Sequence, residues 1–594
     1  MAHAEDPEAT EKRNAAQATC AARDPKCDWL ATLSSLERQS VLRALAARGY
    51  ELEPAPWGKQ IGHVYVFNEE VFAEPTPILD FFNIFHYTTR ESAIHDELTT
   101  HAGEIWNQDL VEESARRLRD PLWSSVVITL PVKSHDPGKV DLLVVTRDVW
   151  SIRLNTTYTY QEGSLTNLNI SLSENNFLGN RDVVAAALTM DQGAIAMGPL
   201  FIDKNVAGKH INLQARIDDI VTRKDLFDDH HFHSEGTDSS IALSKSLWSL
   251  ASEWGWGATF THRYAIARQF VGTGLRTYDD PNTLFNDMLP WTYDSRSWDL
   301  AANGVRQWGT EIKQQFSFGY EVDSLHVRPL DTFMGSDQQR ADFIRDVLPR
   351  NEVVSSPFVG YALFTPWYKT LRNVTTYDLA EDLQLGPSFD VSLGIGVHAL
   401  GGDYNFARTT SSLSWTFPVG KDGYIRPSTS ISLRYRGDTP VERHEDVTFI
   451  DNQVSGSVRV VTPTVSYGRI VAQSTVASRW NDTQNAILGI GSDSGLRGFS
   501  INQFLGQRIV STLVEARTIP WSVWVLRVGG VLFWDSGGAA DSLATMVLHN
   551  DVGAGFRMLI PQTSRQLFRF DLAFPLDGLD AGHPHFIASF DSYF

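Results

Sequence analysis

Apolar and polar side chains alternate with a period of two from about Trp150 to the end of the chain. The alternating segments, each of about ten residues, follow one another without a helical repeat. A membrane-spanning barrel needs this alternation, because its outer face meets lipid and its inner face a polar lumen. The pattern predicts a mainly β chain with a transmembrane antiparallel β-barrel over residues 151–594. At roughly 28 residues for each strand with its loop, the barrel would have about 16 strands. Residues 290–480 contain more strand-like segments than this, and we expect some of them to lie in long outer loops.

The clearest alternation lies near the C-terminus. From Trp524 to Trp534 the even positions are mostly apolar, whereas Arg527 and Asp535 fall on the odd face. Two further segments show the same pattern: Val552, Ala554, Phe556 and Met558 oppose Arg557, and Phe568, Phe570, Leu572 and Phe574 oppose Arg569 and Asp571. On a tilted strand Trp524 and Trp534 would lie about 25 Å apart along the membrane normal. They are therefore predicted to face lipid as parts of the two aromatic girdles.

The lengths of the predicted turns suggest an orientation. Short turns are expected at 518–521 and 561–565, and a longer loop at 536–550. Outer-membrane barrels have short periplasmic turns and longer extracellular loops. If the N-terminal domain is periplasmic, an even number of strands places the start of the first strand and the end of the last strand on the periplasmic side. The short turns then lie on that side too.

The first 150 residues have a different pattern. Residues 1–59 are expected to form a polar arm and a short amphipathic helix that ends near Gly49. Residues 60–150 follow the order strand, helix, helix, strand, strand, which predicts a small α+β domain. The expected elements are a strand at 63–67, a helix capped by Thr88 or Thr89 and closed by Gly103, a helix from Asn107 to Leu118, and strands at 126–132 and 140–145.

Charge and composition narrow the class of protein. The net charge of −20 argues against binding to a nucleic-acid backbone. No stretch approaches the roughly 18 apolar residues of a membrane-spanning helix. Cys20 and Cys27 could form a local disulfide or remain two free thiols, with neither alternative favoured. No intact signal peptide is recognisable, and Ala2-His3-Ala4 could be the remnant of a cleavage site or chance.

The most specific local motif lies between residues 489 and 520. Leu496-Arg497-Gly498-Phe499 resembles the motif at the tip of the inward-folded sixth outer loop in the BamA/TamA superfamily of outer-membrane assembly and translocation proteins. Phe533-Trp534-Asp535 resembles the family's F-x-D motif, and Glu515 with Arg517 its E-x-R setting. Residues 164–182 resemble its second strand and first periplasmic turn, and the order of elements in 60–150 resembles a POTRA domain.

The resemblance implies a loop around 485–505 that folds into the barrel. Glu515 and Asp535 face the lumen by alternation, and a buried carboxylate needs a partner. Arg497 can supply that partner by bidentate pairing, because Gly495 and Gly498 allow the loop to turn sharply inward. The alternative is a solvated surface loop whose arginine pairs with nothing.

Three further features bear on chemistry. Phe586, Phe590 and the terminal Phe594 resemble the C-terminal signal by which outer-membrane assembly machinery recognises its substrates. The run from Asp228 to His233 has metal-ligand side chains, but polar residues are expected in an outer loop, so no metal and no cofactor is predicted. No nucleophile elbow, P-loop or H-E-x-x-H occurs, which favours a protein without enzymatic activity. A hydrolase site built on the barrel wall stays open.

We therefore expect an assembly, insertion or translocation factor of the BamA/TamA type in the outer membrane. Its partners would be outer-membrane lipids, unfolded client polypeptides and possible periplasmic or lipoprotein partners. A single POTRA-like unit favours an accessory or specialised member. The alternative is a porin-like or lipid-conducting channel with the POTRA-like domain as a spacer. Planar-bilayer recording separates the two, because a pore gives a large steady conductance.

Overall fold

The structure is a computed structural model. It describes residues 29–30, 33–71, 87–120, 123–161, 164–223, 233–284, 286–440, 447–492, 494–562, 566–578 and 581–590. Cys20, Cys27, Phe594 and most of the 228–233 run therefore lie outside the described residues.

Helix α3 (Ser35–Arg48) precedes the N-terminal sheet, and its ends follow from the local sequence. The Ser34 hydroxyl accepts from the amide of Glu37, and the Glu37 carboxylate accepts from the amide of Ser34, which forms a capping box. Gly49 ends the helix with a positive φ of 68°. The predicted helix ending near Gly49 is confirmed.

A small α+β unit follows, in the predicted order. It consists of β1 (Gln60–Glu69), α5 (Glu91–His95), α6 (Gln108–Leu118), β2 (Ser124–Lys133) and β3 (Lys139–Asp148). The strands form a sheet of order β1-β3-β2, parallel between β1 and β3 and antiparallel between β2 and β3. The predicted Asn107 cap is confirmed, since its side chain accepts from the amides of Asp109 and Leu110.

The helix predicted from Thr88 or Thr89 to Gly103 is much shorter than expected. Helix α5 spans Glu91–His95, and its N-cap is Arg90 without a side-chain cap bond. Thr89 instead donates its amide to Asp148 Oδ2 at 2.7 Å. After α5 the chain turns onto α6, where the Thr99 hydroxyl donates to the Leu110 carbonyl at 2.8 Å. Hydrogen bonds to other elements, made by Thr89 before α5 and by Thr99 after it, thus replace the expected helical hydrogen bonds.

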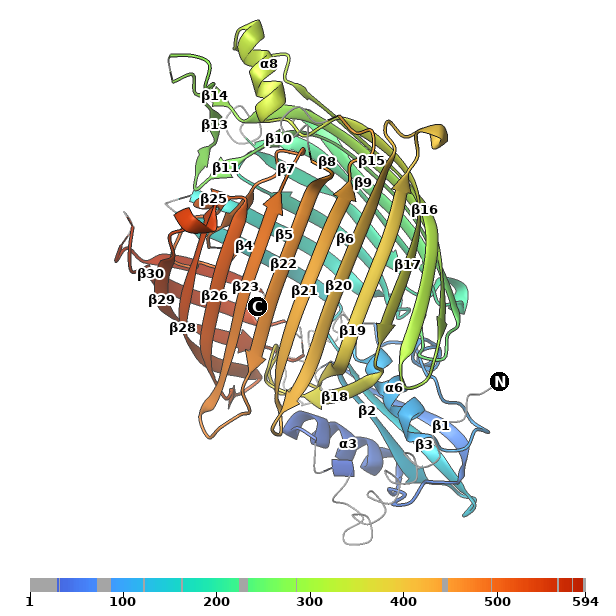
Figure 1. The fold of residues 1–594 in the computed structure, drawn as a ribbon. Coiled ribbons are helices and arrows are strands. Elements are labelled where there is room, and N and C mark those ends of the chain that lie inside the picture. Colours follow the sequence, from blue (N-terminus) through green and yellow to red (C-terminus); the bar gives the residue numbers. More distant parts are fainter. Residues whose placement is uncertain are drawn as a thin grey trace.

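The remainder of the described chain forms a closed antiparallel barrel of 20 strands (Figure 1). Its members are β4 (Ile152–Gln161), β5 (Ser164–Phe177), β6 (Asp182–Met190), β7 (Ala194–Asp203), β8 (Ile211–Thr222), β9 (Ser234–Lys245), β10 (Trp254–Arg268), β15 (Thr292–Trp308), β16 (Lys313–Pro329), β17 (Glu352–Phe364) continued by β18 (Trp367–Leu371), β19 (Glu381–Gly396), β20 (Phe406–Val419), β21 (Gly423–Tyr435), β22 (Phe449–Val461), β23 (Gly468–Trp480), β26 (Arg508–Thr518) continued by β27 (Trp521–Val523), β28 (Leu526–Ala540), β29 (His549–Leu559), β30 (Phe568–Pro575) and β31 (His585–Phe590).

The closed, mainly β architecture was correctly predicted, but the count of about 16 strands was wrong. The expected length of roughly 28 residues for each strand with its loop was too large for a barrel with many tight turns. The strand-like segments of residues 290–480 are mostly strands of the wall, not parts of outer loops.

The two ends of the barrel differ in the length of their connections. Residues 33–150 lie against one end, here called the near end, where turns such as 178–181, 309–312 and 420–422 are short (Figure 1). The opposite, far end carries the longer loops 269–291, 330–351 and 481–507. These loops contain α8 (Asp337–Asp346) and short strand pairs, namely β11 (Phe270–Val271) with β12 (Gly274–Leu275), β13 (Thr277–Tyr278) with β14 (Leu289–Pro290), and β24 (Leu488–Ile490) with β25 (Phe504–Gly506). Single 3₁₀ turns are η1 (Val206–Gly208), η2 (His398–Leu400) and η3 (Leu543–Thr545).

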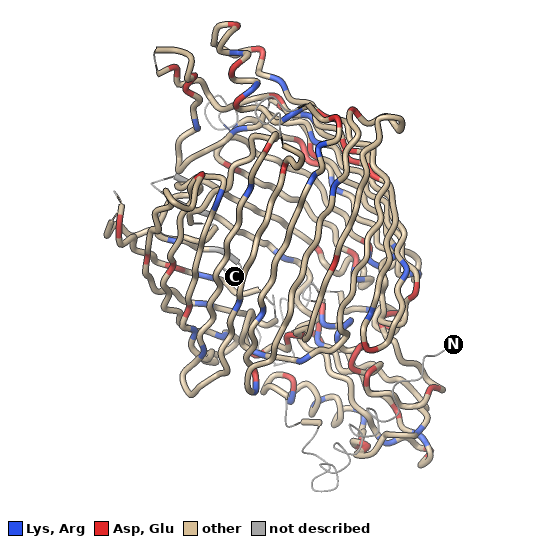
Figure 2. Tube along the Cα trace, viewed as in Figure 1, with Lys and Arg blue, Asp and Glu red and all other residues tan. Residues whose placement is uncertain are grey.

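The barrel wall has an apolar outer face and a polar inner face. On β28, Leu532 and Trp534 are 65% and 40% exposed, whereas Asp535 is fully buried. On β29 and β30, Arg557 and Asp571 are buried, as their inward parity predicts. Figure 2 shows long uncharged stretches along the strands, with many charged residues at the two ends and in the loops. Among the described residues, no helix is long and apolar enough to cross a membrane.

Trp524 does not lie on the strand where the alternation placed it. The pairing of Val523 with Leu526 puts Trp524 at the tip of the hairpin between β27 and β28, with a φ of 54° and 70% exposure. The turn predicted at 518–521 is shifted toward the C-terminus, because β26 continues into β27. Trp534 lies on the outer face of β28, but the two tryptophans do not mark the ends of one strand.

The N-terminal unit and the barrel share one apolar core at the near end. The turn 372–380, between β18 and β19, contributes Tyr377 and Leu379, which pack with α3 and with the β2/β3 face of the sheet. Arg372 of this turn forms an ion pair with Glu37 of α3, and Arg119 binds both carboxylate oxygens of Asp382 at 2.9 and 2.7 Å. Burial raises the pKa of Tyr377 to about 12, because the charged phenolate is disfavoured away from water.

We predict that Tyr377→Ala loosens the N-terminal unit. Truncating a buried aromatic side chain costs about 3 kcal/mol, which would raise the undocked population about a hundredfold. Limited proteolysis of residues 33–150 in the full chain measures that population. Tyr435→Ala, at a half-exposed site on β21, is the control and should leave digestion unchanged. Equal digestion of Tyr377→Ala and the unsubstituted chain would show that this turn does not hold the unit.

Candidate functional site

The far-end loop 481–507 turns back on itself and enters the barrel. Its two arms pair as β24 and β25. Between them the Leu496 amide donates to the Gly491 carbonyl at 2.9 Å, and the Phe499 amide to the Leu496 carbonyl at 3.1 Å. Gly495 has a φ of 128°, which side chains rarely adopt. The loop tip is thereby folded tightly, with Leu496, Arg497 and Phe499 almost fully buried.

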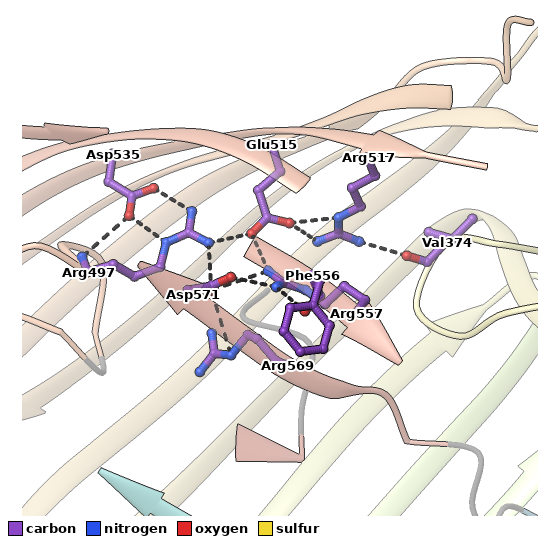
Figure 3. A network of polar contacts seen from close by, with 9 residues as sticks. All are labelled: Val374, Arg497, Glu515, Arg517, Asp535, Phe556, Arg557, Arg569 and Asp571. Carbon is purple, nitrogen blue, oxygen red and sulfur yellow. Dashed lines mark hydrogen bonds and ion pairs between the residues drawn. The ribbon is translucent and has the colours of Figure 1, made fainter. Parts of the chain in front are cut away.

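The Arg497 side chain is the centre of the site (Figure 3). Its Nε and Nη2 donate to Oδ2 and Oδ1 of Asp535, each at 2.7 Å, in a bidentate pair. Nη1 donates to Oε1 of Glu515 at 2.5 Å and lies 3.3 Å from Oδ2 of Asp571. All four side chains are completely buried, so each charge depends on the others for compensation.

An aromatic ring supports the same guanidinium. The Arg497 Cζ atom lies 3.6 Å from the centroid of the Phe533 ring, within the range of a cation–π contact. Phe533 and Asp535 are two residues apart on β28 and therefore share its inner face. The F-x-D spacing thus puts a ring and a carboxylate against one arginine.

Gly498 and Phe499 hold the rest of the loop tip. The Gly498 amide donates to Oδ2 of Asp551 at 2.9 Å. A Cβ at position 498 would lie 2.6 Å from the Asp551 Cβ, so only glycine allows this approach. The Phe499 ring packs edge-on against Phe504 and His549, with centroids 5.3 and 5.6 Å away.

The ionic network continues beyond the loop. Arg517 Nε donates to Oε2 of Glu515 at 2.7 Å. Arg557 contacts Asp571 at 2.5 Å and Glu515 at 3.3 Å, and Arg569 lies 4.0 Å from Asp571. These residues belong to β26, β29 and β30. Successive side chains of a strand point to opposite faces, and these residues occupy the positions that face the lumen. Buried guanidinium groups and carboxylates are thus interleaved, so that no charge in the network stands alone.

A second segment reaches the network from the near end. Arg517 Nη1 donates to the carbonyl of Val374 at 2.7 Å, and Arg527 forms an ion pair with Asp378 at 2.6 Å. Both acceptors belong to the turn 372–380. Glu515 therefore binds Arg497 through one oxygen and, through the other, the arginine that holds this turn.

The structure brings together all eight residues expected at the loop and its lumen partners. Leu496, Arg497, Gly498 and Phe499 meet Glu515, Arg517, Phe533 and Asp535 in one buried cluster. The sequence reasoning missed Asp551, and it placed Arg557, Arg569 and Asp571 in the lumen without assigning them to the network. For Arg557, Arg569 and Asp571 the alternation along the strand indicated the inner face of the barrel, but it did not indicate their partners.

The other predicted site residues lie elsewhere. Phe586 lies on β31 with its ring 4.5 Å from that of Phe570. The side chain of Phe590, and Phe594 altogether, are outside the described residues. The predicted lipid-facing Trp534 is on the outer surface, apart from the network.

We predict that Arg497→Ala destabilises the barrel by about 3–5 kcal/mol, because it leaves buried carboxylates without their counter-charge. Arg497→Lys should recover only part of this, since an ammonium group cannot bind Asp535 in bidentate fashion. Thermal unfolding of the purified chain in detergent measures the effect.

The matched control is Arg345→Ala on α8, where the arginine is 38% exposed in its ion pairs. This change should cost less than about 1 kcal/mol. Equal unfolding temperatures for Arg497→Ala and Arg345→Ala would contradict a stabilising role of the buried network.

Comparison with known proteins gives similarity to solved structures alone. No protein-family model matches the chain, and no curated protein matches it. BamA from Haemophilus ducreyi lacking POTRA domains 1–3 is 11% identical, with 90% of this chain and 85% of that chain covered and a TM-score of 0.36. CdiB from Escherichia coli is 10% identical, with 99% and 100% covered and a TM-score of 0.36. The copper transporter OprC is also 10% identical, with 74% and 72% covered and a TM-score of 0.34. Scores of this size support no inference about function.

Proposed function

We propose that the chain is an outer-membrane assembly, insertion or translocation factor of the BamA/TamA type, with residues 60–150 as a POTRA-like periplasmic domain. In this proposal the near end faces the periplasm and the apolar outer face of the barrel contacts outer-membrane lipids. Unfolded client polypeptides are the substrates, and periplasmic or lipoprotein partners are further candidates. The mechanism requires no catalytic residue and no cofactor.

The observation that carries the proposal is the buried pairing of Arg497 inside the barrel. It agrees with the resemblance of residues 496–499 and 533–535 to the loop and wall motifs of that superfamily. A loop held in the lumen by several charge-assisted hydrogen bonds opposes a permanently open pore. This favours a latched barrel over the porin-like alternative.

The N-terminal sheet offers a place to capture an extended client. The outer edge of β2 is already paired, since the Glu53 amide donates to the Pro131 carbonyl and the Lys133 amide to the Glu51 carbonyl. On the opposite edge, no described residue forms a strand alongside β1 between Val64 and Glu69. A strand edge that no described strand pairs with can accept a peptide by β-augmentation. We assign client capture to β1.

The junction of β31 with β4 is the proposed exit for the client. Strand β31 is described as far as Phe590, and within that range it pairs with β4 at Ala588 and Tyr158. Strands β4 and β31 are the first and the last strand of the barrel, so no turn connects them and their separation opens no hairpin.

We predict that locking this junction stops client assembly. Tyr158→Cys with Ala588→Cys places two thiols at directly paired positions, where a disulfide can form. Vesicles containing the oxidised protein should fail to fold an added outer-membrane barrel client, and reduction should restore folding. The readout is the shift in gel mobility of the folded client.

The control lock is Ser430→Cys with Ser455→Cys on β21 and β22, whose hydroxyl oxygens are 2.7 Å apart. It also cross-links two strands but leaves the β31–β4 junction free, so client folding should continue. Undiminished folding by the oxidised Tyr158→Cys/Ala588→Cys protein would refute the proposed exit. The background for both proteins carries Cys20→Ser and Cys27→Ser.

A further inference from the structure

A cavity of about 700 Å³ lies between α6 and the near-end mouth of the barrel. Figure 1 shows α6 beneath this mouth, beside β18. The barrel residues that line the cavity include Gln307, Gln315, Tyr368 and Asp382. On their strands the neighbouring Trp308, Phe316 and Trp367 are exposed on the outer face, so the lining residues point inward. The cavity is therefore part of the lumen and not of the lipid-facing surface.

All three carboxylates in the cavity wall have donors of their own. Asp382 binds Arg119 through both oxygens. Glu381 accepts the amides of residues 374–376 at 2.9–3.1 Å. Glu113 accepts the Leu250 amide at 2.6 Å. Among the described residues, none of these three carboxylates contacts Arg116, a further charged residue of the cavity wall.

Arg116 is the remaining cation of the cavity wall. Its neighbour Arg117 is paired with Glu97 at 2.5 Å and lies over the Trp248 ring. Arg116 has no carboxylate partner among the described residues, and its guanidinium lies 4.6 Å from the centroid of the Tyr368 ring. A cation–π contact holds the guanidinium beside the ring and uses none of its N–H groups as conventional donors to oxygen, so they stay available. Arg116 is thus a half-buried, oriented cation facing an open cavity.

We propose that Arg116 binds carboxylate groups of a polypeptide passing through the near-end mouth, acidic side chains of an extended client in particular. The inference rests on the proposed function, because that function supplies the polypeptide. A planar guanidinium matches a carboxylate in bidentate geometry. A phosphate has similar chemistry, but a lipid headgroup would have to leave the bilayer and enter the lumen to reach this site. The polypeptide is therefore the partner that the position favours.

The test uses the full chain in detergent micelles and a short labelled Ser/Thr peptide that carries one Asp, with its Asn counterpart as reference. Fluorescence anisotropy should show the Asp peptide binding about tenfold more tightly than the Asn peptide. Arg116→Gln should abolish this difference, and Arg116→Lys should keep part of it. Arg48→Gln, at an exposed site on α3, should leave the difference intact.

Other outcomes overturn the inference. Equal binding of the two peptides by the unsubstituted chain, or an unchanged preference in Arg116→Gln, excludes the site. Displacement of the Asp peptide by inorganic phosphate at lower concentration than by acetate assigns the site to phosphate. Arg116-dependent binding of phosphatidylglycerol vesicles assigns it to lipid.

The oxidised Tyr158→Cys/Ala588→Cys protein separates this inference from the proposed function. Peptide binding needs no strand opening, so this protein should keep the preference for Asp whether or not it folds clients. If the locked protein still folds clients and still prefers the Asp peptide, the proposed exit between β31 and β4 is wrong. The same result supports the Arg116 site.

Discussion

A buried charge needs a counter-charge, and this constraint organises the barrel interior. Arg497 has no access to water, so its free energy depends on Asp535, Glu515 and Asp571 being in place. Those carboxylates are equally buried and depend on arginines in return. The loop that carries Arg497 is consequently held against strands β26, β28 and β30 together, and release of the loop would expose several uncompensated charges at once.

The same network joins the two ends of the barrel. Glu515 accepts from Arg497 of the far-end loop and from Arg517, which also donates to Val374 of the near-end turn. That turn packs against α3 and shares its apolar core with the N-terminal sheet. A movement of the N-terminal unit therefore acts on β26 through the turn 372–380 and Arg517. Strand β26 carries Glu515, which binds Arg497 of the loop. This connection links the N-terminal unit to the loop that Arg497 holds inside the barrel.

Alternation along the strands predicted the faces of the wall, because burial on one side imposes a period of two regardless of loop length. It could not supply the number of strands, since that depends on how tightly each turn closes. Fifteen of the twenty strands precede the loop that carries Arg497, and five follow it. The loop is therefore the eighth at the far end. Asp551 was missed because its role depends on the approach of Gly498, which is distant in sequence.

The most direct test of the latched barrel is the accessibility of the loop tip. In a chain with Cys20→Ser and Cys27→Ser, Ser500→Cys introduces a thiol at a buried position of the loop, and Thr545→Cys introduces one at an exposed far-end position. A membrane-impermeant maleimide added to intact cells should label Thr545→Cys rapidly and Ser500→Cys slowly. Adding Arg497→Ala should make Ser500→Cys reactive. Rapid labelling of Ser500→Cys with Arg497 in place would contradict this prediction and show that the loop lies outside the barrel.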